Sequence, residues 1–247
     1  MSKVMNEPLL QVSGVSKRFG GFTALDQVDL VVWPGERLGL IGPNGSGKST
    51  LVNCISGTLR NEEGEIRFEG RDIGNQQAHR RTRLGLARSF QIPRPFVSMS
   101  VLDNLRVPLV YAARQHEKLA ASDITDEALH ILGQVGLRDM ADTLSGRLTQ
   151  VDMRKLELAR AMAAKPKLLI SDEAMAGLST SEVNDILGLL TGLKEQGVAV
   201  IMIEHVMRAV MKFSERLAVL VAGRNIADGD PGAVASNMEV VTAYLGQ

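Results

Sequence analysis

The sequence predicts an α/β fold in which helices cover a parallel sheet, with an antiparallel β subdomain at the N-terminus and an inserted helical subdomain. Three observations support this prediction. Strand-like segments separated by glycine-containing turns fill the first third, apolar residues recur at three- and four-residue spacing in the middle, and strands alternate with helices from residue 167 onwards. Such alternation is typical of a parallel sheet with helices on its faces.

The first third of the chain is expected to form strands. Turn signals at Gly35-Glu36 and Glu69-Gly70 separate short segments whose apolar residues alternate or run together. In chain order, the expected strands are residues 9–15, 28–32, 37–41, 65–68 and 71–73.

The rest of the chain is expected to be mostly helical at first and then to alternate. Periodicity predicts amphipathic helices at residues 101–114, 123–135 and 149–164, and Asp123 or Thr125 is expected to cap the second. The elements that follow are a strand at 168–171, a helix at 181–196, a strand at 198–203, a helix at 206–213 and a strand at 216–221. We expect a single domain, with residues 1–91 and 159–247 in the core and 92–158 in the helical insert.

Composition narrows the class of protein. The 247 residues carry 28 Lys and Arg against 28 Asp and Glu, so they lack the basic excess that nucleic-acid and anionic-lipid binders usually show. The longest apolar stretches have six residues, against the roughly 20 that span a membrane, and the first ten residues lack the apolar core of a signal peptide. Cys54 is the only cysteine, so no internal disulfide can form. We expect a cytoplasmic protein that binds no nucleic acid.

A glycine-rich segment after the expected strand at 37–41 matches the phosphate-loop pattern G-x-x-x-x-G-K-[ST]. Glycines let backbone N–H groups point at a phosphate, Lys48 supplies positive charge to the β- and γ-phosphates, and Ser49 offers a hydroxyl to Mg²⁺. A glycine-rich hairpin without chemical purpose is the alternative, but the flanking elements and the Lys-Ser pair favour a nucleotide site. The predicted ATP-binding residues are Gly42, Pro43, Asn44, Gly45, Ser46, Gly47, Lys48, Ser49 and Thr50.

Two adjacent carboxylates, Asp172 and Glu173, follow the apolar strand at residues 168–171. Ligands bind at the carboxyl ends of strands in open α/β sheets, and a phosphate loop needs a second strand that holds Mg²⁺ and orients water. We therefore expect Asp172 to approach Mg²⁺ and Glu173 to polarise the attacking water. Such a strand end is often only the start of a capped helix, but beside a phosphate loop it favours ATP hydrolysis.

These ordered motifs resemble those of the ATP-binding subunits of ABC transporters, over essentially the whole chain. The resemblance implies a RecA-like P-loop NTPase core that hydrolyses ATP with Mg²⁺ and is coupled to transmembrane transport. It assigns Phe19 to adenine stacking, Gln91 to Mg²⁺ and the attacking water, and His205 to the γ-phosphate. On their own, Phe19 is also compatible with a core phenylalanine and Gln91 with a solvated loop residue. The remaining histidines are expected to be solvated and are His79, His116 and His130.

Within this family, the chain is most similar to the subunits of importers for branched-chain amino acids and of their relatives for other amino acids, urea and short amides. The phrases that carry this resemblance are residues 88–91, 172–178, 204–211 and 243–246. The expected cargo is therefore a branched-chain amino acid or a related small polar solute. Cassettes for lipopolysaccharide export look similar and are the alternative.

The family signature, Leu-Ser-Gly-Gly-Gln, is altered in this chain. Counting back twelve residues from Arg160 places it at Leu148, Thr149, Gln150, Val151 and Asp152. Thr149 keeps a hydroxyl for a γ-phosphate, but Val151 replaces the second glycine, and a β-branched residue suits neither close approach to phosphate nor unusual φ values. An alternative register at residues 144–147 keeps a serine and a glycine but shifts the following helix by about one turn.

In ABC cassettes two subunits meet head to tail, so each ATP lies between the phosphate loop of one and the signature of the other. An altered signature therefore weakens the partner's site, whereas this chain keeps Asp172, Glu173 and His205 for its own. The resemblance thus implies a heterodimer with a second ATP-binding subunit whose signature is intact. Ser179, where many cassettes carry Asp, is a second departure at the same face.

The resemblance also implies membrane partners and a place at the cytoplasmic face of the inner membrane. Residues 92–99 contain two prolines among Ile92, Phe96 and Met99 and are expected to form a small docking socket for a short cytoplasmic helix of the membrane subunits. The expected partners are two transmembrane permease subunits and, indirectly, a solute-binding protein. A connector with core anchors is the alternative. Two other classes compete with a transporter subunit. One is a non-transport ABC ATPase, and the other is a regulator that binds ATP without hydrolysing it.

Overall fold

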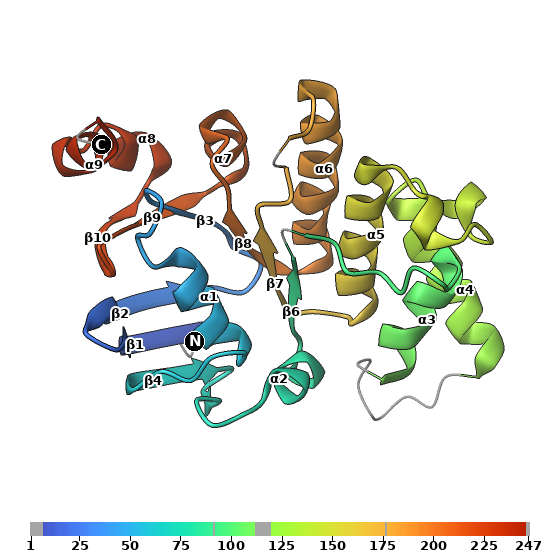
Figure 1. Ribbon diagram of the computed structural model, residues 1–247, viewed down its shortest axis with the longest axis horizontal. Coiled ribbons are helices and arrows are strands. Elements are labelled where there is room, and N and C mark those ends of the chain that lie inside the picture. Colours follow the sequence, from blue (N-terminus) through green and yellow to red (C-terminus); the bar gives the residue numbers. More distant parts are fainter. Residues whose placement is uncertain (1–6, 91, 112–119, 176, 246–247) are drawn as a thin grey trace, which may run out of the picture.

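The computed structural model describes residues 7–90, 92–111, 120–175 and 177–245. These residues form two sheets with helices around them (Figure 1). The expected α/β class is confirmed, and so are a separate antiparallel sheet near the N-terminus and a group of helices in the middle of the chain. None of the helices in the described ranges has both the length and the apolar character needed to cross a membrane.

The smaller sheet is antiparallel and has the strand order β2-β1-β4-β5. Its strands are β1 (Leu10–Phe19), β2 (Phe22–Val32), β4 (Glu63–Phe68) and β5 (Arg71–Asp72). In Figure 1 it lies at the lower left, next to helix α1 (Lys48–Ser56). The first strand continues beyond the expected segment at 9–15 and carries Phe19 at its end.

The larger sheet has the order β10-β9-β3-β8-β7-β6. Its strands are β3 (Arg37–Ile41), β6 (Leu86–Ser89), β7 (Leu168–Asp172), β8 (Ala199–Ile203), β9 (Arg216–Val221) and β10 (Arg224–Gly229). All neighbouring strands are parallel except the pair of β9 and β10. The carboxyl ends of β3, β8, β7 and β6 therefore meet at one edge, and Lys48, Glu173 and His205 follow the ends of three of these strands.

The other helices follow in chain order. They are α2 (Ala78–Leu84), α3 (Val101–Tyr111), α4 (Ala121–Gln134), α5 (Gln150–Ala163), α6 (Thr180–Gly192), α7 (Met207–Phe213), α8 (Pro231–Ala235) and α9 (Met238–Leu245), with 3₁₀ turns η1 (Arg138–Met140), η2 (Ser145–Arg147) and η3 (Leu193–Gln196). Figure 1 shows α3 and α4 at the right, with α5 between them and the sheet. Helix α5 runs without a break across the expected domain boundary at residues 158 and 159.

Both faces of the inner strands β3, β7, β8 and β9 are largely buried, which explains why these strands are almost continuously apolar. In β7, Leu168 and Ile170 pack with α1 and the antiparallel sheet, whereas Leu169 between them packs with α5 and α6 on the opposite face. A third cluster joins Ile41 at the end of β3 to Val240 of α9. The carboxyl ends of these strands are thus packed by three hydrophobic clusters.

Several predictions of element ends are wrong. Helix α4 begins at Ala121, so Asp123 lies in its first turn, where its Oδ2 accepts a hydrogen bond from the backbone N–H of Ala120. Thr125 accepts from Arg106 and does not cap the helix either. The helix expected at 181–196 is α-helical only to Gly192. Elements α2, β6, β10, α8 and α9 were not predicted, and the helix expected at 101–114 is described only to Tyr111.

Candidate functional site

The phosphate-loop segment connects β3 to α1 and is closely surrounded by backbone. A Cβ atom at Gly42, whose φ is +153°, would lie 2.0 Å from the carbonyl oxygen of Leu220. A Cβ atom at Gly47, whose φ is +105°, would lie 2.5 Å from the carbonyl oxygen of Ala24. Only glycine fits at these two positions, because both the space and the backbone conformation exclude a side chain.

Lys48 is the first residue of α1, and its ammonium group points back into the loop. Nζ donates hydrogen bonds to the carbonyl oxygens of Gly42 at 2.7 Å and Pro43 at 2.9 Å. Burial lowers the pKa of Lys48, while the carboxylates of Glu173 and Asp172 act in the opposite direction. The loop thus holds a buried ammonium group at the N-terminus of a helix, an arrangement that suits an anion.

Asp172 ends β7 and makes an ion pair that the sequence reasoning missed. Its Oδ2 lies 2.6 Å from Nη2 of Arg88, at the end of β6, and Nη1 of Arg88 donates to Oδ1 of Asn53 at 2.7 Å. Both partners are mostly buried. Arg88 belongs to a phrase that the sequence analysis singled out, but its pairing depends on β6 lying beside β7. Arg88 therefore contacts only Oδ2 of Asp172 and does not bond to Oδ1.

Glu173 follows Asp172 in a left-handed backbone conformation, with φ of +47°. Its N–H donates to the carbonyl oxygen of Ile203 at 2.8 Å, and its own carbonyl oxygen accepts from Nη1 of Arg154 at 3.2 Å. Oε1 of Glu173 lies 2.9 Å from Nε2 of His205. A non-glycine residue in this region costs of order 1–3 kcal/mol and persists where its surroundings fix it, as these contacts do.

The structure brings most of the predicted site residues to one sheet edge. Lys48 follows β3, His205 follows β8 and Glu173 follows β7, and these three strands are adjacent in the sheet. Gln91 lies outside the described residues. The sequence reasoning missed Arg154, which links α5 to the carbonyl oxygens of Glu173 and Ala174. Nothing in the sequence pattern marked that contact, although α5 directly precedes β7 in the chain, because it depends on how the helix packs against the end of the strand.

The oxygen donors at this edge fit Mg²⁺ by their chemistry. Ser49 is exposed in the first turn of α1, and Asp172 offers a carboxylate. Among the described residues no group of three or more His, Cys, Asp and Glu side chains could hold a metal ion by itself. This donor set agrees with the usual coordination of Mg²⁺ by one or two protein oxygens together with substrate phosphates and water.

Phe19 is not a core residue, because 48% of it is exposed at the end of β1. Nζ of Lys17 lies 5.4 Å from the centroid of its ring, a cation–π contact. An exposed aromatic ring on a firmly held strand end is suited to stacking on a flat ligand. The alternative interpretation of Phe19 as a core phenylalanine is therefore wrong.

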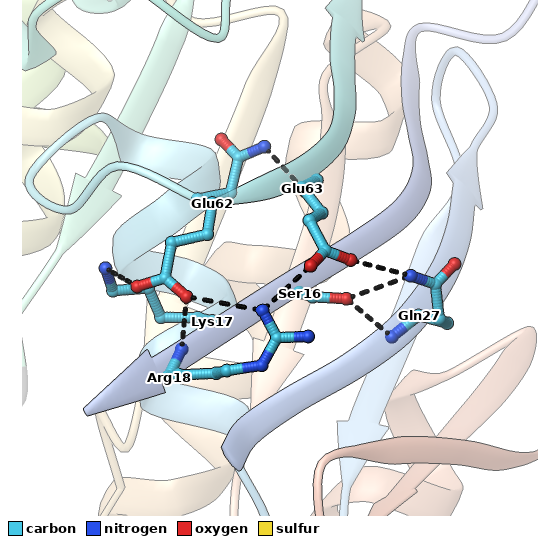
Figure 2. A network of polar contacts seen from close by, with 7 residues as sticks. Ser16, Lys17, Arg18, Gln27, Glu62 and Glu63 are labelled. Atoms are coloured by element: carbon cyan, nitrogen blue, oxygen red, sulfur yellow. Dashed lines mark hydrogen bonds and ion pairs between the residues drawn. The ribbon is translucent and has the colours of Figure 1, made fainter. Parts of the chain in front are cut away.

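A polar network holds the strand end that carries Phe19 (Figure 2). Glu62 accepts hydrogen bonds from Nζ of Lys17 at 2.8 Å and from the backbone N–H of Arg18 at 3.1 Å. Glu63 accepts from Nη1 of Arg18 at 2.8 Å and from Nε2 of Gln27 at 3.2 Å. The bond from Lys17 lowers the pKa of Glu62. Strands β1, β2 and β4 are thus tied together just before Phe19.

The segment Leu148 to Asp152 forms the start of α5. Thr149 caps this helix, and its Oγ1 accepts from the backbone N–H of Asp152 at 3.2 Å and donates to Oδ2 of the same residue at 2.6 Å. Gln150 and Val151 lie in the first turn, and Val151 is not among the residues with positive φ. The expectation that Val151 conflicts with an unusual φ is therefore wrong, since the position is helical.

The alternative register of the signature has no exposed hydroxyl. Ser145 is fully buried, donates to the carbonyl oxygen of Phe96 at 2.9 Å and accepts from Nδ2 of Asn104 at 3.2 Å. Thr149, in contrast, is exposed at a helix N-terminus. Ser179 also has a local role: it caps α6 in a reciprocal capping box with Glu182, a position where Asp and Ser serve equally well.

The segment after residue 91 presents apolar side chains to solvent. Ile92 is 70% and Phe96 is 44% exposed, so they are not core anchors. Both main-chain polar groups of Phe96 are hydrogen-bonded to the buried amide of Asn104, and the guanidinium group of Arg160 lies 5.1 Å from the Phe96 ring. A cavity of about 200 Å³ is lined by Arg160 and by Arg88 of β6. The segment is held in place while its apolar side chains remain exposed.

Comparisons with known proteins agree with this geometry. The model of the ABC transporter family matches residues 25–176. The high-affinity branched-chain amino acid transport ATP-binding protein BraF of Pseudomonas aeruginosa is 35% identical, over 98% of this chain and 100% of that protein. The protein LivG of Escherichia coli K12, which carries the same description, is 34% identical over 98% of this chain and 100% of LivG.

Solved structures show the same fold. The ADP conformation of an ATP-binding cassette of an ABC transporter superimposes with a TM-score of 0.88 at 33% identity and covers 98% of this chain and 100% of that chain. A nucleotide-free ATP-binding cassette from an ABC transporter gives a TM-score of 0.85 at 31% identity, with the same coverage of both chains. The likeness therefore extends over the full length of these cassettes.

Proposed function

Because the chain belongs to the ABC transporter family of ATP-hydrolysing cassettes, we propose that it energises an importer of branched-chain amino acids or a related small polar solute. The observation that carries the proposal is the meeting of Lys48, Glu173 and His205 at one sheet edge, with Glu173 and His205 2.9 Å apart. The cargo class rests on full-length similarity to ATP-binding proteins of branched-chain amino acid transport.

In the proposed reaction each residue of this edge has a defined task. The phosphate loop and Lys48 bind the β- and γ-phosphates, because backbone N–H groups and a buried ammonium group converge there. Phe19 stacks on the adenine. The carboxylate of Glu173 orients and polarises the attacking water, and His205, held against it, hydrogen-bonds the γ-phosphate. Ser49, Asp172 and Gln91 would hold Mg²⁺, which would supply positive charge to neutralise the phosphates.

We further propose that the chain works as a heterodimer with a second cassette. The hydroxyl of Thr149 is hydrogen-bonded to the carboxylate of Asp152, so the helix N-terminus that would meet the partner's γ-phosphate already carries a negative charge. Like charges repel, and a γ-phosphate would bind this turn poorly. The site at Lys48 and Glu173 therefore needs an intact signature from a different chain.

The exposed segment with Ile92 and Phe96 is the proposed contact for a short cytoplasmic helix of a transmembrane permease subunit. The proposed assembly has two such subunits, which would place the chain at the cytoplasmic face of the inner membrane and link it to a solute-binding protein. Two apolar side chains on a firmly held backbone, beside a cavity lined by Arg88 and Arg160, suit a short helix that brings apolar residues of its own. Closure of the two cassettes around ATP would then move the permease subunits.

The test is to compare phosphate release by this chain, by a candidate partner cassette and by their mixture. The proposal expects the mixture to exceed the sum of its parts. It also expects Glu173→Gln in this chain to abolish nearly all activity, while the equivalent change in the partner leaves most of it. Robust, cooperative hydrolysis by the lone chain would show that residues 148–152 work as a signature and that no partner is needed.

Cargo is tested separately, by reconstituting the complex in vesicles and measuring ATP-dependent uptake of labelled leucine, urea and a short amide. Uptake of leucine that competes only with isoleucine and valine would support the branched-chain class. ATP-dependent export of a lipid-linked sugar, without amino acid uptake, would overturn the proposal of import.

A further inference from the structure

Glu204 is a buried carboxylate between the loops that carry Glu173 and His205, and no step of the proposed hydrolysis uses it. It directly follows β8 and is only 3% exposed. Its Oε1 accepts a hydrogen bond from the backbone N–H of Met175 at 2.7 Å, and its Oε2 accepts from the backbone N–H of His205 at 3.3 Å. One side chain therefore bridges the main chains of both loops.

This arrangement is costly for a side chain that serves packing alone. Burial raises the pKa of Glu204, and the negative charge of Glu173 raises it further, while the N–H groups of Met175 and His205 act in the opposite direction. Within the described ranges, no ion pair of Glu204 with a lysine or an arginine is present. A buried carboxylate without a cation is less favourable than an apolar side chain of the same volume.

The two bonds of Glu204 close a ring of contacts around the site. Backbone pairing of β7 with β8 ends at Asp172 and Ile203, and the N–H of Glu173 makes the last main-chain bond to β8. Beyond that point the two loops are connected by the hydrogen bonds of the Glu204 carboxylate. The ring runs from Glu173 along the chain to Met175, across Glu204 to His205, and from the His205 imidazole back to the Glu173 carboxylate.

We propose that Glu204 is a positioning residue for ATP hydrolysis, which fixes the loop of Glu173 against the loop of His205. The inference rests on the proposed function only in that hydrolysis uses these two side chains. A glutamine retains one accepting oxygen, and its amide nitrogen can only donate, so Glu204→Gln keeps one of the two bonds. Glu204→Met keeps neither bond at a similar volume. The exposed Glu195 provides a matched control as Glu195→Gln.

The first test needs no activity. In spectra of the full-length chain, the imidazole resonances of His205 are identified by their loss in His205→Gln. Replacing Glu173 by Gln should shift these resonances in the otherwise unchanged protein, because the carboxylate lies 2.9 Å from the ring. The same replacement should cause little shift in the Glu204→Met protein, since the loops are no longer held together. An equal shift in both backgrounds would overturn the proposal.

The second test separates positioning from folding. In the assembled ATPase, Glu204→Gln should lower kcat roughly tenfold, the effect of losing one hydrogen bond of a charged group, and leave KM for ATP unchanged. Glu204→Met should lower kcat further, and Glu195→Gln should change neither. Glu204→Gln should change the Tm little, because it removes a buried charge together with one hydrogen bond, whereas Glu204→Met leaves the N–H groups of Met175 and His205 without their acceptor and should lower the Tm.

A lowered Tm with a wild-type kcat would show that Glu204 is only structural and would overturn the inference. If the unmodified assembly does not hydrolyse ATP, the proposed function fails instead. In that case the spectra still decide whether Glu204 joins the two loops, because they are recorded without nucleotide turnover.

Discussion

Nε2 of His205 lies 2.9 Å from Oε1 of Glu173, although 32 residues separate them in the chain. The contact exists because β7 and β8 are adjacent parallel strands, which place the residues after their carboxyl ends side by side. His205 is half exposed and Glu173 is largely buried, so the pair lies at the boundary between the sheet and solvent. Such a position lets a water molecule reach the carboxylate.

Glu173→Gln should lower kcat for ATP hydrolysis by at least about 100-fold, because a neutral amide cannot polarise water as a general base does. Binding of ATP should be retained, since the phosphate loop and Lys48 are unchanged. Phosphate release measures the first effect and equilibrium binding of labelled ATP the second. A variant that hydrolyses normally would remove Glu173 from its assigned role.

Repair of the signature should create a homodimer. The double change Val151→Gly and Asp152→Gln removes the side chain beside the expected phosphate and the carboxylate that now bonds to Thr149. Placed in the Glu173→Gln background, it should dimerise in ATP and stay monomeric in ADP. Size-exclusion chromatography with light scattering checks this, and Glu173→Gln alone is the control. ATP-driven dimers of the control would contradict the assignment of a weak signature.

Arg88→Met should destabilise the fold by roughly 3 kcal/mol, because it leaves the buried carboxylate of Asp172 without its partner. Adding Asp172→Asn should recover part of the loss, since the unpaired charge is then removed. The free energy of unfolding in urea, measured for both variants, tests the pair. Equal stability of Arg88→Met and the wild type would mean that the ion pair contributes nothing measurable.

Phe19→Ala should weaken ATP binding about tenfold, because stacking of a base on an aromatic side chain contributes of order 1–3 kcal/mol. Phe19→Trp should bind as tightly as the wild type. The dissociation constants of ATP and of inorganic triphosphate are compared, and triphosphate should be unaffected in both variants. A parallel loss of triphosphate affinity would point to a disturbed phosphate loop and not to stacking.

Cys54 should make the fold sensitive to alkaline pH. The thiol is fully buried, and burial raises its pKa to about 11. In the unfolded chain the thiol ionises near its ordinary pKa of about 8.5, so above this value unfolding releases a proton. The stabilising contribution is complete below about pH 8.5 and is lost as the pH rises towards 11. Between these two pH values, the Tm of the wild type should fall more steeply with rising pH than the Tm of Cys54→Ala. Parallel curves of Tm against pH for the two proteins would refute this.

The motifs could be found in the sequence because their chemistry is local. A loop of glycines before a Lys-Ser pair needs only a strand before it and a helix after it, and both are visible as apolar patterns. The strand that ends in Asp172 and Glu173 is continuous and apolar because both faces of its sheet are buried. The predicted cap of α4, Asp123 or Thr125, was wrong because helix propensity and local hydrogen bonding define the first residue of a helix only to within several positions.

Only the tertiary structure decided which of these segments are neighbours. The strand order puts β8 between β3 and β7, and this alone brings His205 and Glu204 between the phosphate loop and Glu173. The pairing of β6 with β7 also brings Arg88 to Asp172, and the packing of the whole chain exposes Phe19 and Ile92 while burying Ser145. The sequence by itself determined the residue types and the chemistry that they allow. Their distances and exposure depend on contacts between distant segments, which local patterns do not encode.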